Sequence, residues 1–395
     1  MTNETKTDSA VAAILGEANV AAETDAHAVD GVTPGIVATP ANYDEVGRVL
    51  AHADANGLAV IPLGGRIHAG LGNLPARYDI GLDATRLGGV VEFEPADLTI
   101  TVQAGMPLAR LREVTAESGL MVPFDPAIPG EATVGGVLAA DVWGAASCSL
   151  GTPRDFTIGM RVVTASGRLT RAGGKVVKNV AGYDLCKLYI GSVGTLGVIV
   201  EATFKTKPLP KAEAAVALAF ESAVEACAAA NRFHTTGLSV RSSRVVREDG
   251  VWVLDQRLAG MPSAVERSIR EIRSAGAHHD APLRAGVASA VVLRINAVPS
   301  KVAGLMEAAA SATSSARIEA HPVTGACLVF AEGADAIEMA RGMSPTCVVQ
   351  RCPAELKRGI DVFGGVPASF ALMQAIKQQF DPKGTLSPGR FVGHL

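Results

Sequence analysis

The sequence predicts an α+β protein with two domains, and three observations lead to this class. The chain has 395 residues, more than one ordinary hydrophobic core accommodates. Amphipathic helix patterns alternate with short strand patterns in its first half. Residues 212–351 show the order strand, helix, strand, strand, helix, and then much the same order again. That order is typical of two ferredoxin-like halves forming an antiparallel sheet with helices on one face.

The first half begins, after a short tail, with the helix pattern "DSAVAAILGEA". Asn42 and Glu45 form a capping-box pattern at the start of the next helix, and the strand "LAVIPL" follows it and ends at paired glycines. Pro107 opens a third helix after the alternating strand "DLTITVQAG". Two strands surround the turn "TASGRL". A short helix is then expected at residues 184–190, before the strand "GVIVEATFKTK".

The stretch "KPLPK", residues 207–211, is the best linker candidate in the chain. The predicted parts are a tail with a short helix, a first domain, a second domain, and a C-terminal helix and tail that return to the first domain, at residues 1–29, 30–208, 209–360 and 361–395. The helices of the second domain are expected near residues 222–232, 263–274, 299–312 and 334–343.

Composition and charge exclude several classes of function. The net charge of −3, from 36 basic and 39 acidic residues, argues against a nucleic-acid-binding protein. No apolar run reaches the roughly 18 residues of a spanning helix, so no transmembrane segment is expected. The N-terminus lacks the basic and apolar regions of a signal peptide, which predicts a cytoplasmic location. The six cysteines are scattered without a C-x-x-C pair, a spacing that does not match iron–sulfur ligation.

Three glycine-bearing stretches stand in the first half, at residues 62–72, 129–144 and 178–199. Glycines let successive backbone N–H groups turn inward as an anion-binding nest, so converging loops of this kind suit the pyrophosphate of a dinucleotide. The alternative is that they are ordinary tight turns in a glycine-rich protein. Neither G-x-G-x-x-G after a first strand nor a P-loop pattern occurs, which excludes both of those nucleotide-binding motifs.

Three strings carry a family resemblance: "PGEATVGGVLAAD", "RDFTIGMRVVTASGRL" and "KNVAGYDLCKLYIGSVGTLGVI". In this order, after a strand-ending glycine loop, they resemble the FAD-binding domain of the vanillyl-alcohol oxidase and p-cresol methylhydroxylase (PCMH) family. With "FDPKGTLSPGRF" near the C-terminus, the chain is similar to the 2-hydroxy-acid dehydrogenase branch, and within it to the FAD-binding E subunit of glycolate oxidase. The resemblance implies a PCMH-type domain of two α+β subdomains that hold FAD between them, and a ferredoxin-like antiparallel α+β cap domain.

The resemblance also implies which residues bind the cofactor. The first glycine loop would approach the pyrophosphate, the second stretch would line the flavin, and the third would lie against the adenosine end. The expected cofactor-binding residues are Leu63, Gly64, Gly65, Arg66, Ile67, His68, Pro129, Thr133, Gly135, Gly136, Gly151, Gly194, Thr195, Gly197, Val198 and Arg390.

The first loop departs from the family pattern at Arg66 and Ile67, where most relatives carry a third glycine and then Ser or Thr. A residue other than glycine tolerates a positive φ poorly, so Arg66 either weakens flavin binding or replaces a backbone contact with a side-chain contact to phosphate. We expect FAD binding to be retained because arginine is a good phosphate partner. In some relatives a histidine directly after the paired glycines binds FAD covalently. Here Arg66 occupies that position and His68 lies two residues later, so non-covalent FAD is expected.

The catalytic residues stay unassigned. Lys178, Tyr183 and Asp184 lie near the cofactor strings, yet each also fits a structural role as a surface charge, a packed ring or a cap. The adjacent histidines of "AGAHHDAPLR" could ligate a metal, but an exposed loop is the simpler interpretation, and no metal is expected. Val193 occupies a position where the catalytic D-type relatives of the same family carry glutamate. The sequence therefore offers no obvious base that could remove a proton from a hydroxy acid.

The function implied by the resemblance is that of an FAD-dependent oxidoreductase acting on CH–OH donors, as the FAD-binding subunit of a glycolate or related 2-hydroxy-acid dehydrogenase or oxidase complex. The implied partners are a D-type FAD hydroxy-acid dehydrogenase subunit and an iron–sulfur subunit. The hydroxy acid would be an indirect substrate, and the partners could bring the chain to a membrane. Two alternatives stay open: a cofactor-poor scaffold subunit, and a stand-alone flavin oxidase of a hydroxy acid or sugar.

Overall fold

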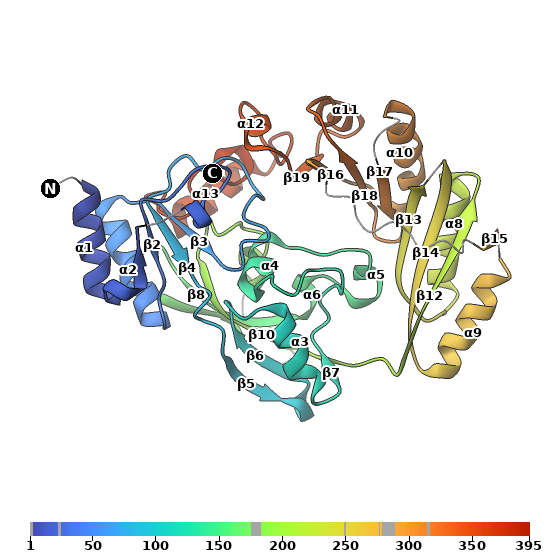
Figure 1. Ribbon diagram of the computed structural model, residues 1–395, viewed down its shortest axis with the longest axis horizontal. Helices are drawn as coiled ribbons and strands as arrows, with labels where there is room; N and C mark the ends of the chain where they lie inside the picture. The colour runs from blue at the N-terminus through green and yellow to red at the C-terminus, as the bar shows by residue number, and fades with distance from the viewer. Residues whose placement is uncertain are drawn as a thin grey trace.

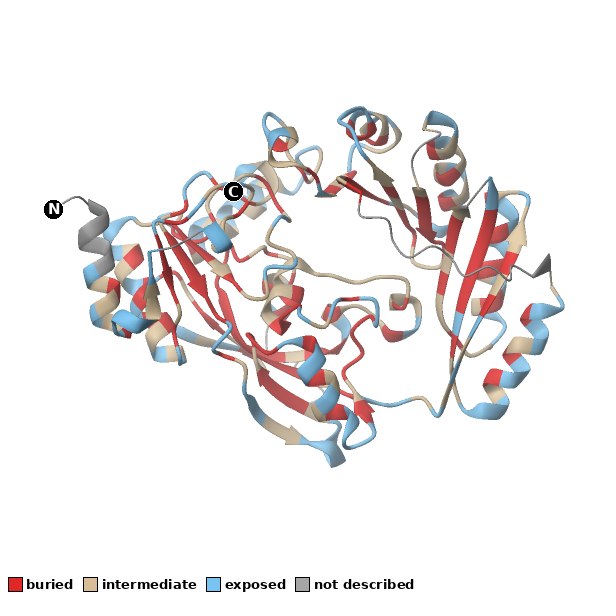
Figure 2. Cartoon of the chain, in the orientation of Figure 1, coloured by how far each residue is buried: buried red, intermediate tan, exposed pale blue. Residues whose placement is uncertain are grey.

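The computed structural model describes residues 3–22, 25–174, 183–248, 250–275, 277–278, 289–313 and 317–395. Within these residues, three larger β-sheets are packed with helices, and the predicted α+β class is confirmed (Figure 1). The most deeply buried residues follow the strands of these sheets and the inward faces of the helices (Figure 2). The first two sheets come from the first half of the chain and the third from the second half.

The first sheet has the strand order β1-β2-β4-β3. β2 (Ile36–Ala38) and β3 (Val60–Leu63) each pair in parallel with β4 (Ile80–Asp83), and β1 (Val20–Ala21) is the antiparallel edge strand. The helices α1 (Asn3–Leu15) and α2 (Tyr43–Asn56) pack against one another and share a hydrophobic core with this sheet.

Helix α2 shows how local sequence sets these elements. The side chain of Asn42 accepts a hydrogen bond from the Glu45 N–H at 2.9 Å, and the Glu45 carboxylate accepts the Ala41 N–H at 2.7 Å. The first of these bonds satisfies one N–H group that the first turn of a helix leaves without a partner. The helix ends at Gly57, whose φ of 67° is the left-handed conformation typical of a C-cap glycine. The predicted N-cap at Asn42 is therefore confirmed, whereas the Glu45 carboxylate bonds the Ala41 N–H and the Asn42 side chain and not the Asn42 N–H of a full capping box.

The second sheet is antiparallel, with the order β5-β6-β10-β8-β9. Its strands are β5 (Val90–Glu94), β6 (Thr99–Gln103), β8 (Thr157–Val163), β9 (Leu169–Gly173) and β10 (Val198–Lys205). The helices that lie between its strands along the chain are α3 (Leu108–Ala116), α4 (Val134–Ala140), α5 (Ser147–Leu150), α6 (Pro153–Phe156) and α7 (Leu185–Tyr189). A two-stranded ladder joins β7 (Leu120–Met121) to β11 (Lys207–Pro208), just before the chain enters its second half.

The third sheet has eight antiparallel strands in the order β15-β12-β14-β13-β17-β18-β16-β19. Its strands are β12 (Ala212–Phe220), β13 (Val240–Glu248), β14 (Val251–Gly260), β15 (Ala277–His278), β16 (Val291–Asn296), β17 (Arg317–His321), β18 (Ala326–Ala331) and β19 (Val348–Arg351). Four helices share one hydrophobic core with it: α8 (Ala223–Thr235), α9 (Pro262–Arg273), α10 (Pro299–Ala312) and α11 (Asp335–Met343). The four predicted helices and the repeated element order are confirmed.

The other face of the third sheet contacts the first half of the chain. Arg294 of β16 lies over the ring of Trp143, with its guanidinium carbon 3.5 Å from the ring centroid. Ser149 of α5 donates a hydrogen bond to the carbonyl of Arg241 on β13 at 2.6 Å. These contacts place the segment that follows α4 between the second and third sheets.

The last residues return to the first sheet. After α12 (Ala354–Lys357) and α13 (Phe370–Phe380), the chain runs beside β3: the Val60 N–H donates to the Thr385 carbonyl at 2.7 Å, and the Ser387 N–H to the Val60 carbonyl at 2.9 Å. Short 3-10 helices lie at Glu17–Asn19, Asp25–His27, Pro95–Asp97 and Val392–His394. In the described part of the chain, no helix combines the length and apolarity needed to cross a membrane.

Candidate functional site

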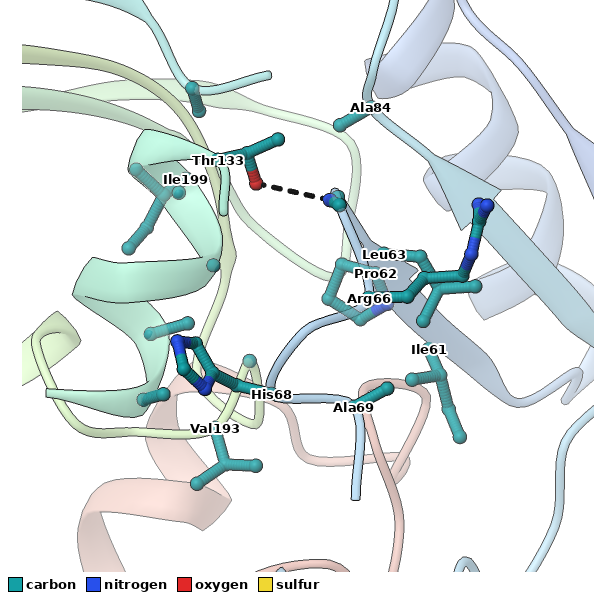
Figure 3. A pocket seen from close by; sticks show the side chains of 18 of the residues that line it. Ile61, Pro62, Leu63, Arg66, His68, Ala69, Ala84, Thr133, Val193 and Ile199 are labelled. Carbon is teal, nitrogen blue, oxygen red and sulfur yellow. Dashed lines mark hydrogen bonds between the residues drawn. The ribbon is translucent and has the colours of Figure 1, made fainter. Parts of the chain in front are cut away.

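A cavity of the described structure lies where the first two sheets meet (Figure 3). The loop after β3, one side of α4, and the segment that leads into β10 form its walls. Its empty space, open mouth included, is about 870 Å³, within the range of small-molecule and cofactor sites. The lining side chains are Val29, Ile61, Pro62, Leu63, Arg66, Ile67, His68, Ala69, Leu71, Ala84, Ala104, Ala132, Thr133, Ala139, Ala140, Val193, Val198, Ile199 and Arg390, joined by Gly64, Gly65, Gly135, Gly136, Gly194 and Gly197.

The glycines of the first loop let the chain pass very close to the start of α4. A Cβ on Gly64 would lie 2.0 Å from the Thr133 Oγ1, and a Cβ on Gly65 would lie 2.3 Å from the Glu131 carbonyl oxygen. The Gly65 N–H donates to the same Thr133 hydroxyl at 3.3 Å. Only glycine permits this close approach of the loop to the start of α4.

The glycines of the third stretch serve protein packing as well. Gly194 has a φ of 72° in a turn that is attached to α4 through the Val193 N–H and the Ala139 carbonyl, 2.9 Å apart. A Cβ on Gly197 would lie 2.4 Å from the Val162 Cγ1 on β8. The idea that these glycines make room for a nucleotide therefore covers only part of their role, because contacts within the chain already require them.

Arg66 adopts a left-handed backbone conformation, which favours glycine. Its φ is 60°, and its guanidinium contacts the Asp83 carboxylate, with Nη1 3.3 Å from Oδ2. Asp83 is also contacted by the His27 Nε2 at 3.0 Å. The side chains of Arg66 and His68 leave the loop in opposite directions (Figure 3). Arg66 thus occupies the turn with a strained backbone, and its guanidinium forms an ion pair with Asp83.

This strain leads to a prediction for two substitutions at one site. Arg66→Gly and Arg66→Ala both remove the half-exposed ion pair, but only glycine relieves the left-handed backbone. We expect Arg66→Gly to be more stable than Arg66→Ala by about 1 kcal/mol. Urea unfolding of the two variants measures the difference directly. Equal stability, or a more stable alanine variant, would contradict the strained turn.

His68 is the one imidazole in the described cavity lining. Its Nε2 is buried and has no hydrogen-bond partner among the described residues. Burial lowers the pKa of His68 from its ordinary value, which favours the neutral ring.

The lowered pKa has a consequence for stability. Because the unfolded chain binds this proton more readily than the folded one, folding stability falls as the pH drops below about 6.5, until the lower folded-state pKa is passed. We expect His68→Gln to lose less stability than the parent protein between about pH 7.5 and about pH 5. Urea unfolding at these two pH values tests this, and an identical pH dependence in both proteins would show that His68 does not contribute.

The structure brings most of the predicted cofactor-binding residues together and leaves three apart. Thirteen of them line the cavity: Leu63, Gly64, Gly65, Arg66, Ile67, His68, Thr133, Gly135, Gly136, Gly194, Gly197, Val198 and Arg390. Pro129 is exposed in the loop before α4, Gly151 ends α5 with a φ of 84°, and Thr195 is buried with its hydroxyl bonded to the Ser192 carbonyl at 2.7 Å. These three lie outside the lining.

The other residues considered in the sequence have varied locations. Asp184 caps α7, since its carboxylate accepts the Cys186 N–H at 3.1 Å, and Tyr183 is 97% exposed. Val193 lines the cavity with a φ of 54°, a strained value for a β-branched residue. Lys178, His279 and Asp280 lie outside the described residues.

Several lining residues were missed by the sequence analysis, chiefly small ones. They include Ala69, Ala104, Ala139, Ala140 and Ile199. A signal was available for two of them: Ala139 and Ala140 follow Gly135 and Gly136 by one helical turn, so they share one face of α4. Ala104 offers no such signal because only the sheet brings β6 to the cavity.

Comparison with known proteins bears on the cofactor. Residues 34–173 match the family model of the FAD binding domain, and residues 366–391 match that of the C-terminal domain of FAD linked oxidases. The chain carries an FAD-binding domain. Its cavity fits the cofactor, because the glycine contacts leave a nucleotide-sized space and two buried nitrogens of the lining, the His68 Nε2 and the Arg390 Nη1, have no partner among the described residues.

Relatives of the FAD-binding domain include enzymes of more than one kind. The chain is 40% identical over 178 residues to D-2-hydroxyglutarate dehydrogenase of Xanthomonas citri pv. viticola, a match covering 45% of this chain and 38% of the relative. It is 42% identical over 132 residues to glycolate oxidase subunit GlcE of Escherichia coli, covering 33% and 38%. The matches thus span about two fifths of these relatives. They support a PCMH-type FAD-binding domain without singling out the E subunit.

Solved structures extend the likeness to the whole fold. The crystal structure of p-cresol methylhydroxylase with bound substrate superposes with a TM-score of 0.75 at 16% identity, covering 99% of this chain and 97% of that one. The predicted fold, with two α+β subdomains and an antiparallel α+β cap, is confirmed.

Proposed function

We propose that this chain is the FAD-binding subunit of a glycolate or related 2-hydroxy-acid dehydrogenase complex. The observation that carries the proposal is the cavity between the two subdomains, lined by thirteen of the residues expected to bind FAD. Two relatives are named for 2-hydroxyglutarate and glycolate, and these names support a 2-hydroxy acid as the substrate class. FAD supplies the redox chemistry when bound, while the protein sets its position and potential.

The character of the lining favours a cofactor site over a site for proton abstraction. Its described side chains are mostly small and apolar, and the ionisable ones are Arg66, His68 and Arg390. Oxidation of a hydroxy acid needs a group that accepts a proton near the reacting carbon. A neutral His68 could accept a proton, but its burial against α4 suits packing against the cofactor. We therefore propose that a D-type partner subunit oxidises the hydroxy acid and that this chain relays the electrons.

An iron–sulfur subunit is proposed as the next electron acceptor. All six cysteines of this chain are free thiols, and five of them are buried. For Cys186, Cys227 and Cys327, burial raises the pKa to about 12, which disfavours the thiolate that a cluster requires. A cytoplasmic location, with membrane contact through the partners, forms part of the same proposal.

The first experiment is a visible absorption spectrum of the purified chain before and after denaturation. We expect a flavin spectrum whose chromophore is released on denaturation, because His68 is offset from the usual attachment position. A chromophore that stays with the denatured chain would contradict non-covalent binding. A colourless, folded protein, both alone and co-expressed with its partners, would favour the scaffold alternative.

The second experiment separates relay from catalysis. Glycolate, D-lactate and D-2-hydroxyglutarate are added without oxygen to the isolated chain and to the co-expressed complex, and bleaching of the flavin band is followed. We expect bleaching in the complex only. Bleaching of the isolated chain, with production of hydrogen peroxide in air, would instead show a stand-alone oxidase.

A further inference from the structure

The loop at residues 66–72, part of which Figure 3 shows in the cavity wall, accepts hydrogen bonds from two buried cations of the C-terminal region. We propose that Lys357 and Arg390 act together as a carbonyl clamp that positions this loop for FAD. The proposal rests on the cavity being the FAD site. Both residues are positioning residues, and Arg390 has a second nitrogen available for the cofactor.

Lys357, at the end of α12, forms the first half of the clamp. Its ammonium nitrogen donates to the Gly70 carbonyl at 2.5 Å and to the Gly72 carbonyl at 3.0 Å. The Asp30 carboxylate lies 2.7 Å from the same nitrogen, and the Lys357 side chain is 1% exposed. Burial lowers the pKa of Lys357, while Asp30 favours the charged form. The Asp30 carboxylate therefore holds the ammonium group in one place, and the same group donates hydrogen bonds to the two loop carbonyls.

Arg390, in the C-terminal tail, forms the second half. Its Nη2 donates to the Ala69 carbonyl at 2.6 Å and also to the Leu71 carbonyl. Its own carbonyl accepts the Asn73 N–H at 3.0 Å, so the tail and the loop are bonded in both directions. The residue is 2% exposed, lines the cavity, and has an Nη1 without a hydrogen-bond partner among the described residues.

Together the two cations hold four successive carbonyls, those of residues 69–72. An unpaired buried donor is costly, so the Arg390 Nη1 points to a ligand that completes its hydrogen bonds. An anionic oxygen of the FAD pyrophosphate has the required chemistry. The C-terminal region thus holds one end of the loop. The segment before its other end, at Gly64 and Gly65, packs against the start of α4. The loop is ordered before the cofactor arrives, which lowers the entropy lost on binding.

The test uses the full chain with flavin removed, and compares substitutions of the clamp with a matched control. Lys357→Met and Arg390→Met remove each cation, and Asp30→Asn combined with Lys357→Met avoids leaving a buried carboxylate without its partner. Arg390→Lys retains a positive charge at position 390. Lys383→Met is the control: Lys383 also joins the tail to the first domain, through Asp54 at 2.8 Å, but it contacts no residue of the loop.

Two measurements are made: the dissociation constant of FAD by fluorescence titration, and hydrogen–deuterium exchange of the peptide covering residues 64–73 in the flavin-free protein. We expect the methionine variants of the clamp to bind FAD at least about tenfold more weakly than the parent protein, and their peptide to exchange faster. Arg390→Lys should bind FAD more tightly than Arg390→Met, because it retains a positive charge. Lys383→Met should match the parent protein in both measurements.

The outcomes separate the clamp from the function. Unchanged FAD affinity and unchanged exchange in folded clamp variants would overturn the clamp while leaving the FAD site standing. A parent protein that binds no FAD would overturn the proposed function, and the exchange data would still decide whether Lys357 and Arg390 order the loop.

Discussion

Gly65→Ala should greatly weaken FAD binding and destabilise the protein. The new Cβ would lie 2.3 Å from the Glu131 carbonyl oxygen, a backbone atom that cannot rotate away. The loop must therefore move back by about 1 Å to restore an ordinary contact, which breaks the hydrogen bond from the Gly65 N–H to Thr133. We expect a loss of about 1–3 kcal/mol in unfolding free energy and FAD binding weaker by at least about tenfold.

The measurement combines urea unfolding with titration of FAD into the flavin-free protein. Gly304→Ala is the matched control, because Gly304 lies inside α10 and the added Cβ would have no atom within 4 Å besides those of its chain neighbours and of the surrounding helix backbone. That variant should gain about 0.5–1 kcal/mol and leave FAD affinity unchanged. If Gly65→Ala bound FAD as tightly as Gly304→Ala, the close approach of the loop to α4 would not matter for the cofactor.

Phe204→Ala should cause a larger loss of stability, about 3–5 kcal/mol. Phe204 is on β10 with no exposed surface, and its ring centroid lies 5.3 Å from that of Phe124 and 6.1 Å from that of Phe156. Truncation leaves a cavity in the core of the second sheet, and removes two aromatic contacts as well as the buried area. The same strand begins at Val198 in the cavity wall, so a weakened core also loosens the cofactor site.

Urea unfolding of the flavin-free protein measures this loss without the stabilising effect of bound FAD. Leu372→Ala on α13 serves as the control because Leu372 is 63% exposed, and its cost should stay within about 0.5 kcal/mol. A cost below about 1 kcal/mol for Phe204→Ala would mean that the three rings do not form a tightly packed core.

The sequence by itself determined the elements whose signals are local. The start of α2 follows from Asn42 and Glu45, and Pro299 marks the start of α10 at the predicted residue. The repeated element order of the second half and the glycine stretches of the first are also periodic or compositional patterns. Such signals depend on neighbours within a few residues, and these are present in the sequence whatever the tertiary structure.

The tertiary structure alone decided which distant residues share the site. Lys357 lies 287 positions from Gly70, whose carbonyl it holds, and no periodic pattern links them. Only the fold shows that Arg66 takes a φ of 60° and contacts Asp83, and that Pro129, Gly151 and Thr195 lie outside the cavity lining. The sequence predicts that the two ferredoxin-like halves form an antiparallel sheet, but it does not indicate that the pairing of β13 with β17 joins them. Long-range contacts depend on shape and on the pairing of buried charges, and the sequence carries no local record of either.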